Sequence, residues 1–256
     1  MVMNLLRSIW AYIVCATVLV VRLPLRKKVN ALAETDKQGA MEMLWPFANW
    51  IGHMACRVLK VETDINGLEN VPMDGSVVFV GNHLSNFDAP LMLAAIPRPS
   101  GFIVKEELKK VPVFAGWIEA MGCYFLPRGE SRKSLEVIIA ATKLLKTNAL
   151  GMVIFPEGTR SKDGKMAHFK PGSLKVATRS GASIVPFAIE HTNVVMPRGS
   201  WIIKKGKVNV TFLPAITPEA YKDKETTELT RGIMTDIAAV IGCEVPPDED
   251  AITIEA

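Results

Sequence analysis

The sequence lacks the residue patterns that mark several common kinds of site. It contains only four cysteines, which are widely spaced with no C-x-x-C pair and no cysteine–histidine cluster. This spacing argues against a structural zinc site or a disulfide framework and fits free thiols in a reducing compartment. The formal net charge is only +4 over 256 residues, so the overall balance gives no reason to expect a nucleic-acid partner.

The signature motifs of several enzyme classes are missing as well. There is no G-x-S-x-G nucleophile elbow, no phosphate-binding P-loop, no G-x-G-x-x-G and no H-E-x-x-H. These absences remove the usual signals of serine hydrolases, nucleotide-binding proteins and zinc proteases. Neither a metal nor a cofactor is expected.

The N-terminal region lacks a charge-free run long enough to cross a bilayer. Residues 8–21 are uncharged and would form about 21 Å of helix, whereas a bilayer core is about 30 Å thick. Residues 5–25 reach that length only by including Arg7 and Arg22, which would have to snorkel. We therefore expect a shallow or re-entrant insertion in preference to a complete span.

A basic cluster without acidic neighbours follows this apolar run. It consists of Arg22, Arg26, Lys27 and Lys28, and beside an apolar segment it predicts contact with anionic headgroups, at about 1 kcal/mol per residue. A solvated linker is the alternative. The cluster also argues against a cleaved signal peptide ending at 31–33, because such a peptide would carry few charges there.

Residues 39–60 have the periodicity of an amphipathic helix. Trp45 and Trp50 lie off or beside its apolar stripe, at a position suited to headgroup level, and Pro46 fits near a helix start. We predict that residues 1–60 form a membrane-anchoring segment with a two-helix motif, and that residues 61–256 form the globular domain. The second helix packing on that domain is the alternative, and the two interpretations are compatible.

Short apolar runs alternate with helical patterns after residue 61. The expected strands are residues 76–80, 102–104, 123–126, 152–155, 183–189 and 208–213. The clearest helix begins at Ser131, a plausible N-cap, and places Leu135, Ile138, Ile139, Thr142 and Leu145 on one face. This order predicts an α/β fold with a mixed, largely parallel sheet flanked by helices, and a site at the carboxyl ends of the strands.

The first polar motif at a strand end is Asn82-His83-Leu84-Ser85-Asn86-Phe87-Asp88. Histidine is the usual general base near neutral pH, and a carboxylate can fix its tautomer and stabilise the imidazolium. His83 and Asp88 can meet across a strand-to-helix turn. The alternative is that Asp88 caps a helix over 89–96 and His83 is a turn residue. Nothing marks Ser85 as a nucleophile.

Three further motifs lie within or directly after predicted strands. In 155–161 (FPEGTRS), Pro156 and Gly158 shape a tight loop, and Arg160 offers a planar fork for phosphate. The run 122–128 delivers Arg128, and with Lys105 these arginines would form a cationic pocket. Glu157 can orient an arginine or accept a hydrogen bond from a substrate hydroxyl; a local surface ion pair is the alternative. Val185-Pro186 is read as structural.

These four motifs, in the order in which they occur along the chain, resemble the boxes of the glycerophospholipid acyltransferases. His83 to Asp88 matches the H-x4-D box, and Phe155 to Arg160 matches the F-P-E-G-T-R box. Gly122 to Arg128 is similar to the intermediate G-x-x-F-x-x-R box, with Pro127 where an acidic residue is common. Val185-Pro186 is similar to the fourth. The resemblance covers 76–214, and the short chain with its N-terminal anchor looks like the bacterial 1-acyl-glycerol-3-phosphate acyltransferases.

The resemblance implies an acyltransferase domain over 61–256, in which His83, oriented by Asp88, deprotonates the free 2-hydroxyl of a lysophosphatidate. The acyl donor would be acyl-CoA or an acyl carrier protein thioester, no covalent acyl-enzyme would form, and the product would be phosphatidic acid. Arg128, Glu157, Gly158, Thr159 and Arg160 would hold the acceptor, with Lys105 added from its charge and position. The implied location is the cytoplasmic face of a bacterial inner membrane.

Several alternatives remain open at the level of sequence. The acceptor can be another lysophospholipid, glycerol 3-phosphate or an unusual lipid alcohol, because the boxes are shared. The chain length, which leaves no room for an extra acceptor-binding domain, favours lysophosphatidate. A non-catalytic lipid-binding protein and a thioesterase that activates water with His83 are the alternatives from other classes.

Overall fold

The computed structural model describes residues 2–111, 113–127, 129, 131–161 and 164–247. At their centre lies a seven-stranded sheet in the order β1-β7-β6-β2-β5-β3-β4. Neighbouring strands run parallel except β6 and β7, which pair antiparallel. The strands are β1 (Val61–Asn66), β2 (Val77–Gly81), β3 (Ser100–Lys105), β4 (Tyr124–Leu126), β5 (Gly151–Ile154), β6 (Ser183–Glu190) and β7 (Gly206–Phe212). The predicted α/β fold with a largely parallel sheet is confirmed.

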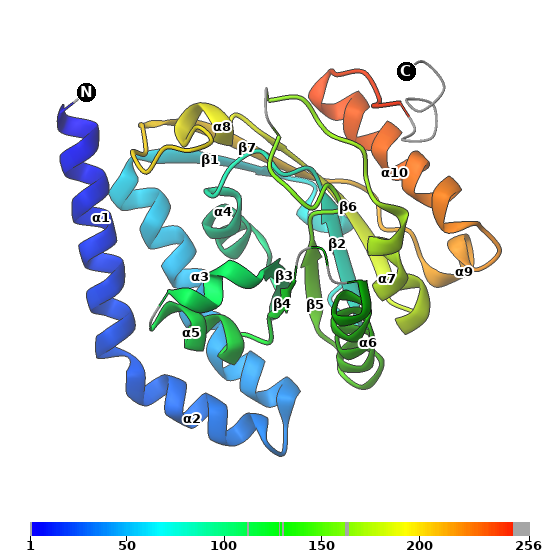
Figure 1. The fold of residues 1–256 in the computed structure, drawn as a ribbon, viewed down its shortest axis with the longest axis horizontal. Coiled ribbons are helices and arrows are strands. Elements are labelled where there is room, and N and C mark those ends of the chain that lie inside the picture. Colours follow the sequence, from blue (N-terminus) through cyan, green and yellow to red (C-terminus); the bar gives the residue numbers. More distant parts are fainter. Residues whose placement is uncertain (1, 112, 128, 130, 162–163, 248–256) are drawn as a thin grey trace.

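Helices cover both faces of the sheet (Figure 1). One face carries α3, α4 and α5, and the other carries α6, α7 and α10, while α1 and α2 lie outside α3. The helices are α1 (Val2–Val21), α2 (Leu23–Ala33), α3 (Lys37–Leu59), α4 (Asp88–Ala95), α5 (Phe114–Ala120), α6 (Ser131–Thr147), α7 (Lys175–Ser180), α8 (Thr192–Val195), α9 (Pro218–Tyr221) and α10 (Thr226–Ile241).

The central strand β2 explains why the short apolar runs predict strands. Val77 and Phe79 point into the core beneath α4, and Val78 and Val80 point into the core beneath α6, α7 and α10. All four side chains are completely buried. A strand covered on both faces is apolar throughout, which is the pattern typical of parallel sheets. The edge strand β1 is absent from the strands that the sequence predicts. The reason is that Val61 is the only buried residue among its six.

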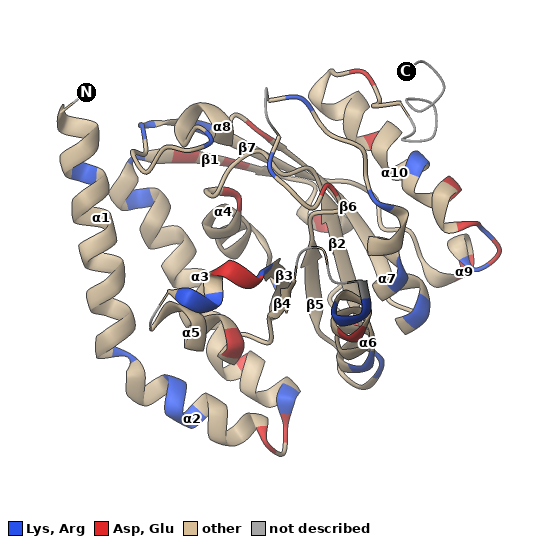
Figure 2. Cartoon of the chain, viewed as in Figure 1, with Lys and Arg blue, Asp and Glu red and all other residues tan. Residues whose placement is uncertain are grey.

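The N-terminal region contains three helices where the sequence predicts two. Arg26, Lys27 and Lys28 of the basic cluster belong to α2, and Arg22 is the N-cap residue directly before it. Pro24 lies in the first turn of α2, where proline is tolerated. Figure 2 shows α1 almost free of charge and the basic residues gathered on α2. A separate small core, which includes Leu19, Val29 and Trp117, joins α1, α2, α3 and α5.

Helix α3 packs on the globular domain, chiefly against α4 and β1. The headgroup-level placement of Trp45 is wrong, because Trp45 is buried in the core beneath α4. Trp50 is 48% exposed and stacks on Phe47. Pro46 lies well inside α3 instead of near its start.

The predicted face of α6 is only partly correct. Thr142 and Leu145 are buried and Ile138 packs against the same core, but Leu135 and Ile139 are exposed. Ala141 and Leu144 complete the buried stripe, so the helix is rotated relative to the expected orientation. The side chain of Ser131 lies outside the described part of the chain, so its capping role stays a prediction.

Helices α3 and α4 approach each other so closely that one residue must be a glycine. A Cβ atom built on Gly52 would lie 2.5 Å from the backbone nitrogen of Ala94 and 2.7 Å from the carbonyl oxygen of Pro90. Backbone atoms cannot rotate out of the way as a flexible side chain can. Gly52 therefore sets the depth of α4, the helix that begins at Asp88.

We predict that Gly52→Ala lowers the free energy of unfolding by about 1–3 kcal/mol, because α3 has to move away from α4. The matched control is Gly232→Ala on the exposed face of α10, where an added Cβ meets no atom within 4 Å. That change should stabilise the chain by about 0.5–1 kcal/mol, because alanine favours a helix over glycine. Urea unfolding followed by circular dichroism measures both, and equal stability of the Gly52→Ala variant and the wild type would contradict the close-packing argument.

Candidate active site

The polar site begins where β2 ends, at the carboxyl edge of the sheet. Asn82 follows Gly81 and is completely buried. Its side-chain amide donates to the carbonyl of Ile189 and accepts from the Ile189 N–H, both at 2.8 Å. The side chain thus replaces a pair of strand-to-strand hydrogen bonds and locks the end of β2 to β6. The chain after Asn82 can turn without leaving buried polar groups unpaired.

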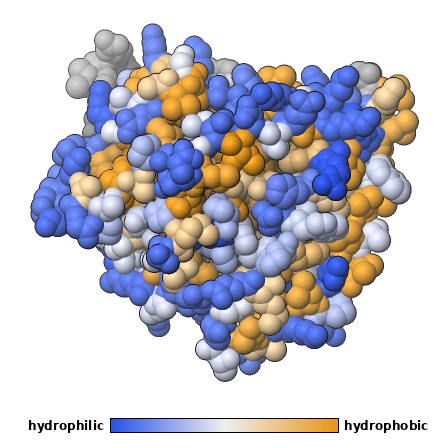
Figure 3. Space-filling view, turned by 180° about the vertical axis from the view of Figure 1, so that it is seen from behind, coloured by the Kyte–Doolittle hydropathy of each residue, from blue (hydrophilic) through white to orange (hydrophobic). Residues whose placement is uncertain are grey.

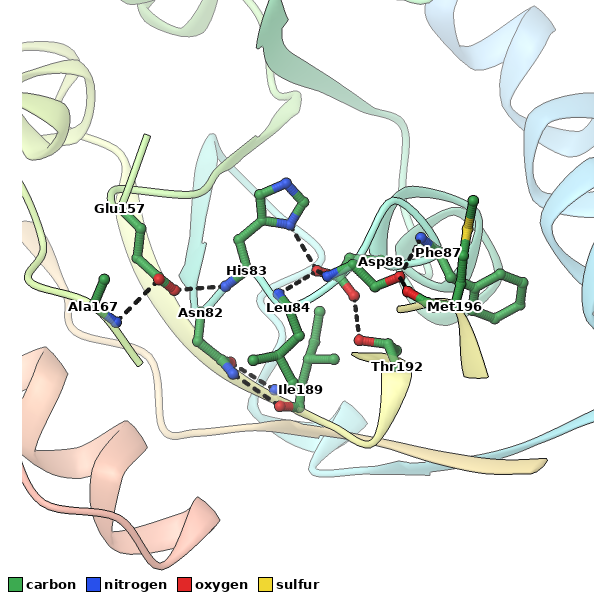
Figure 4. Close-up of polar contacts among 11 residues, drawn as sticks. Asn82, His83, Leu84, Phe87, Asp88, Glu157, Ala167, Ile189, Thr192 and Met196 are labelled. Atoms are coloured by element: carbon green, nitrogen blue, oxygen red, sulfur yellow. Dashed lines mark hydrogen bonds and ion pairs between the residues drawn. The ribbon is translucent and has the colours of Figure 1, made fainter. Parts of the chain in front are cut away.

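His83 and Asp88 meet directly across this turn, as the motif predicts (Figure 4). The Nδ1 atom of His83 lies 2.6 Å from Oδ2 of Asp88. A proton on Nδ1 donates to the carboxylate and leaves Nε2 as the basic nitrogen. The His83 side chain is 16% exposed, whereas that of Asp88 is completely buried. The arrangement is that of a general base held by a carboxylate.

Asp88 also organises the turn that carries the histidine. Its Oδ2 accepts hydrogen bonds from the backbone N–H groups of Leu84 and Ser85 at 2.8 and 2.9 Å. Its Oδ1 accepts one from the hydroxyl of Thr192 at 2.5 Å. Asp88 is the first residue of α4, where the positive end of the helix dipole favours a carboxylate. The capping and catalytic interpretations of Asp88 are therefore compatible.

The second motif forms a tight turn that packs against the histidine. The Gly158 N–H donates to the Phe155 carbonyl at 3.1 Å, which closes a β-turn with Pro156 at its second position. The Phe155 ring stacks on the His83 ring with centroids 4.3 Å apart. The Ser161 N–H donates to the His83 carbonyl at 2.8 Å. The two loops therefore hold each other in place.

Glu157 binds backbone groups of the protein with both of its oxygens. Oε1 accepts from the His83 N–H at 2.7 Å, and Oε2 accepts from the Ala167 N–H at 3.0 Å. The side chain is 4% exposed. This geometry favours a positioning role in which Glu157 fixes the backbone of the base. Contact with a substrate, the role expected by resemblance, stays a prediction.

The environment of Glu157 raises the pKa of its carboxyl group from 4.5 to about 8. Burial away from water is the main cause, and the negative charge of Asp88 adds to it. The hydrogen bonds from the His83 and Ala167 N–H groups lower the pKa, but they do not offset the burial.

Ser85 is engaged by the fold and is not an available nucleophile. Its hydroxyl donates to the Met196 carbonyl at 2.7 Å and accepts from the Phe87 N–H at 3.1 Å. The side chain is completely buried. No group of three or more His, Cys, Asp or Glu side chains that could hold a metal ion occurs among the described residues.

The residues predicted to bind a phosphate lie near the same edge of the sheet where the structure describes them. Lys105 ends β3, which pairs with β5 immediately before the Phe155 turn. Gly158 has φ +67°, a conformation that favours glycine, and Thr159 and Arg160 follow it, both partly buried. Arg128 lies outside the described residues. The roles of these residues in binding stay predictions.

Sequence reasoning missed Thr192 and assigned no role to Asn82. Thr192 directly follows His191, a non-glycine residue with φ +67° at the end of β6. Because β6 is the neighbour of β2, the rule that sites form at strand carboxyl ends points to residue 192. The sequence does not reveal the strand order, so a role for Thr192 could not be predicted from it.

Comparison with known proteins agrees with this geometry. The family model described as Acyltransferase matches residues 62–190, just over half of the chain. The chain belongs to the acyltransferase family. The matched region contains the His83–Asp88 pair and the Phe155 turn, so the resemblance drawn from the four boxes is confirmed at the level of the family.

Curated relatives in the family are named as 1-acyl-sn-glycerol-3-phosphate acyltransferases. The chloroplast protein BAT2 of Brassica napus is 36% identical over 151 residues, covering 58% of this chain and 43% of the relative. The Borreliella burgdorferi protein is 31% identical over 129 residues, covering 50% of this chain and 51% of the relative. The chain thus spans about half or less of the length of these two relatives.

A solved structure matches over nearly the full length of both chains. It is the crystal structure of the 1-acyl-sn-glycerophosphate (LPA) acyltransferase PlsC from Thermotoga maritima, with a TM-score of 0.81 and 26% sequence identity. The match covers 94% of this chain and 95% of that one. Most of the N-terminal helical region therefore lies within the match.

We predict that the raised pKa of Glu157 makes wild-type stability fall with pH relative to Glu157→Gln. The folded state favours the protonated carboxyl. Its contribution to the free energy of unfolding is therefore complete below the unfolded-state pKa of 4.5 and is lost as the pH rises through the folded-state pKa of about 8. Each unit of pKa shift corresponds to about 1.4 kcal/mol, so the expected difference is a few kcal/mol. Urea unfolding of both proteins across this range provides the measurement, and parallel pH profiles would contradict the assignment.

Proposed function

We propose that this acyltransferase moves a fatty acyl group from an acyl thioester to the sn-2 hydroxyl of a 1-acyl-glycerol 3-phosphate, giving phosphatidic acid. The observation that carries the proposal is the 2.6 Å contact between Nδ1 of His83 and Asp88, which leaves Nε2 as the base. The names of the relatives support the choice of acceptor.

The reaction needs one base and no covalent acyl-enzyme intermediate. Nε2 of His83 takes the proton of the acceptor hydroxyl while its oxygen attacks the thioester carbonyl carbon. Asp88 stabilises the imidazolium that forms. The tetrahedral intermediate then collapses, the carbon–sulfur bond breaks, and the imidazolium returns the proton to the departing thiolate. The engaged hydroxyl of Ser85 supports this direct transfer over an acyl-serine route.

The acceptor phosphate is assigned to the cationic residues at the same strand edge. Arg160 and Arg128 would pair with phosphate oxygens through their planar guanidinium groups. Gly158 and Thr159 would offer backbone or hydroxyl donors, and Lys105 would add charge. The donor is acyl-CoA or the thioester of an acyl carrier protein; these share the same reacting bond.

The proposed location is a membrane surface, which for a bacterial enzyme would be the cytoplasmic face of the inner membrane. Helix α1 is long and apolar enough to cross a membrane by length and composition. Most of its large apolar side chains are exposed, including Leu6, Trp10 and Ile13 at 62%, 60% and 53%. A water-exposed apolar face of this size is typical of a helix that contacts lipid.

We predict that His83→Ala lowers the rate of acyl transfer by about 10²–10⁴-fold, the usual contribution of a general base. The assay supplies the purified chain with lysophosphatidate and a panel of acyl thioesters. The matched control is His53→Ala on the exposed side of α3, which should keep full activity. Near-normal turnover of His83→Ala would overturn the mechanism, and release of free fatty acid without phosphatidic acid would show a thioesterase instead.

We predict that Thr192→Val lowers kcat about tenfold at unchanged KM, because Asp88 loses one hydrogen bond and holds His83 less firmly. Thr192→Ser keeps the hydroxyl and should restore kcat, which separates positioning from simple packing. Steady-state kinetics of the three proteins provides the measurement. A Thr192→Val variant with wild-type kcat would remove this residue from the catalytic arrangement.

A further inference from the structure

The connection between β6 and β7 is tied to α1 by several polar contacts. Ser8 Oγ accepts a 2.8 Å hydrogen bond from the Ile203 N–H, and the Tyr12 hydroxyl donates a 2.8 Å bond to the Trp201 carbonyl. The Arg7 guanidinium also donates to the Ile203 carbonyl, at 3.3 Å. Helix α1 therefore turns a polar stripe toward this connection and leaves most of its large apolar side chains exposed.

Residues 194–205 of this connection, here named the tryptophan loop, form a compact structure. The Lys204 N–H donates to the Val195 carbonyl at 2.8 Å and closes the loop at its base. Trp201 is 74% exposed, and Val194 is 61% exposed. The loop is well anchored, yet Trp201 does not pack into any core of the protein. Core packing therefore does not explain why a tryptophan stands at this position.

The charges of the tryptophan loop are all positive. It contains Arg198, Lys204 and Lys205 and no acidic residue, and all three basic side chains are exposed. An exposed tryptophan flanked by lysines has the composition of an element at a membrane–water interface, where the ring lies among headgroups and the amines meet lipid phosphates.

The exposed apolar surface continues from the loop onto α1. Figure 3 shows apolar residues gathered along the right-hand side of the molecule, where α1 lies in that view. The hydrogen bonds that Ser8 accepts from Ile203 and that Tyr12 donates to Trp201 place the tryptophan loop directly beside this helix. A flat, anionic lipid surface can contact both elements at once.

We propose that the tryptophan loop is a second membrane-binding element, with Trp201 placed among the lipid headgroups and Lys204 and Lys205 paired with anionic phosphates. The proposal commits to an anionic phospholipid bilayer as the occupant of this surface. It rests on the membrane-associated α1 of the proposed function and adds a separate contact from the catalytic domain.

The same contacts define how α1 meets the bilayer. If α1 crossed the hydrocarbon core, the loop residues bonded to it would be drawn in as well, together with Lys204 and Lys205. Charged side chains at the bilayer centre are strongly unfavourable. The loop is compatible with α1 lying along the interface, with its polar stripe toward the protein and its apolar face in the lipid.

The charge part of the test uses the full chain and vesicles of phosphatidylcholine, alone or mixed with phosphatidylglycerol. Replacing both Lys204 and Lys205 by serine should weaken binding to the anionic vesicles by about 25-fold, since each lysine contributes about 1 kcal/mol, or about fivefold. Binding to pure phosphatidylcholine should not change. The matched control replaces Lys143 and Lys146, two exposed lysines on α6, and should bind as the wild type does.

The second part of the test measures directly whether the Trp201 ring contacts lipid. Brominated phospholipids quench indole fluorescence on contact, and the signal of Trp201 is the difference between the wild type and Trp201→Phe. We expect this difference signal to be quenched in vesicles. Trp201→Ala should also weaken binding to both kinds of vesicle, whereas Ile139→Ala, an exposed apolar residue on α6, should not.

An unquenched Trp201 signal, together with wild-type binding of the lysine variant, would overturn the proposal. This result is separable from failure of the proposed function. Acyl transfer to lysophosphatidate in detergent micelles should be the same in Trp201→Ala and the wild type. If neither protein transfers acyl groups but Trp201 is quenched by lipid, the loop is a membrane contact and the proposed reaction is wrong.

Discussion

The arrangement of the site depends on one buried carboxylate. Asp88 accepts hydrogen bonds from the His83 ring, from two backbone N–H groups of the turn and from the Thr192 hydroxyl. An unpaired carboxylate at this depth would be strongly unfavourable, so each of these donors is required by the burial of Asp88 itself. Three separate pieces of chain, the turn after β2, the first turn of α4 and the end of β6, are brought together by satisfying one side chain.

The second carboxylate plays a different part although it lies nearby. Asp88 faces the imidazole, whereas Glu157 faces the backbone on either side of the site. Burial shifts the pKa of Glu157 upward to about 8. The two acidic residues, which come from the first and third boxes along the chain, therefore hold different parts of one residue: Asp88 binds the imidazole of His83, and Glu157 binds its backbone N–H.

The sequence revealed the parts of the fold that local patterns encode and missed the parts that long-range pairing decides. The buried strand β2 was visible because both of its faces are apolar, and His83 and Asp88 were visible because they share one turn. The strand β1 was missed because its edge position needs few apolar residues. Thr192 was missed because its contact with Asp88 joins residues 104 positions apart. The sequence motif identified Glu157 as a site residue, but it did not reveal that its carboxylate oxygens accept hydrogen bonds from backbone N–H groups.

The reversal of β7 relative to β6 has a thermodynamic consequence. Because the two strands are antiparallel, the chain between them leaves and re-enters the sheet near its catalytic edge. One continuous segment, residues 191–205, therefore contacts Asp88 through Thr192, Ser85 through Met196 and α1 through Ile203. If bilayer contact and ligand binding at His83 favoured the same arrangement of this segment, each would raise the affinity for the other by the same factor.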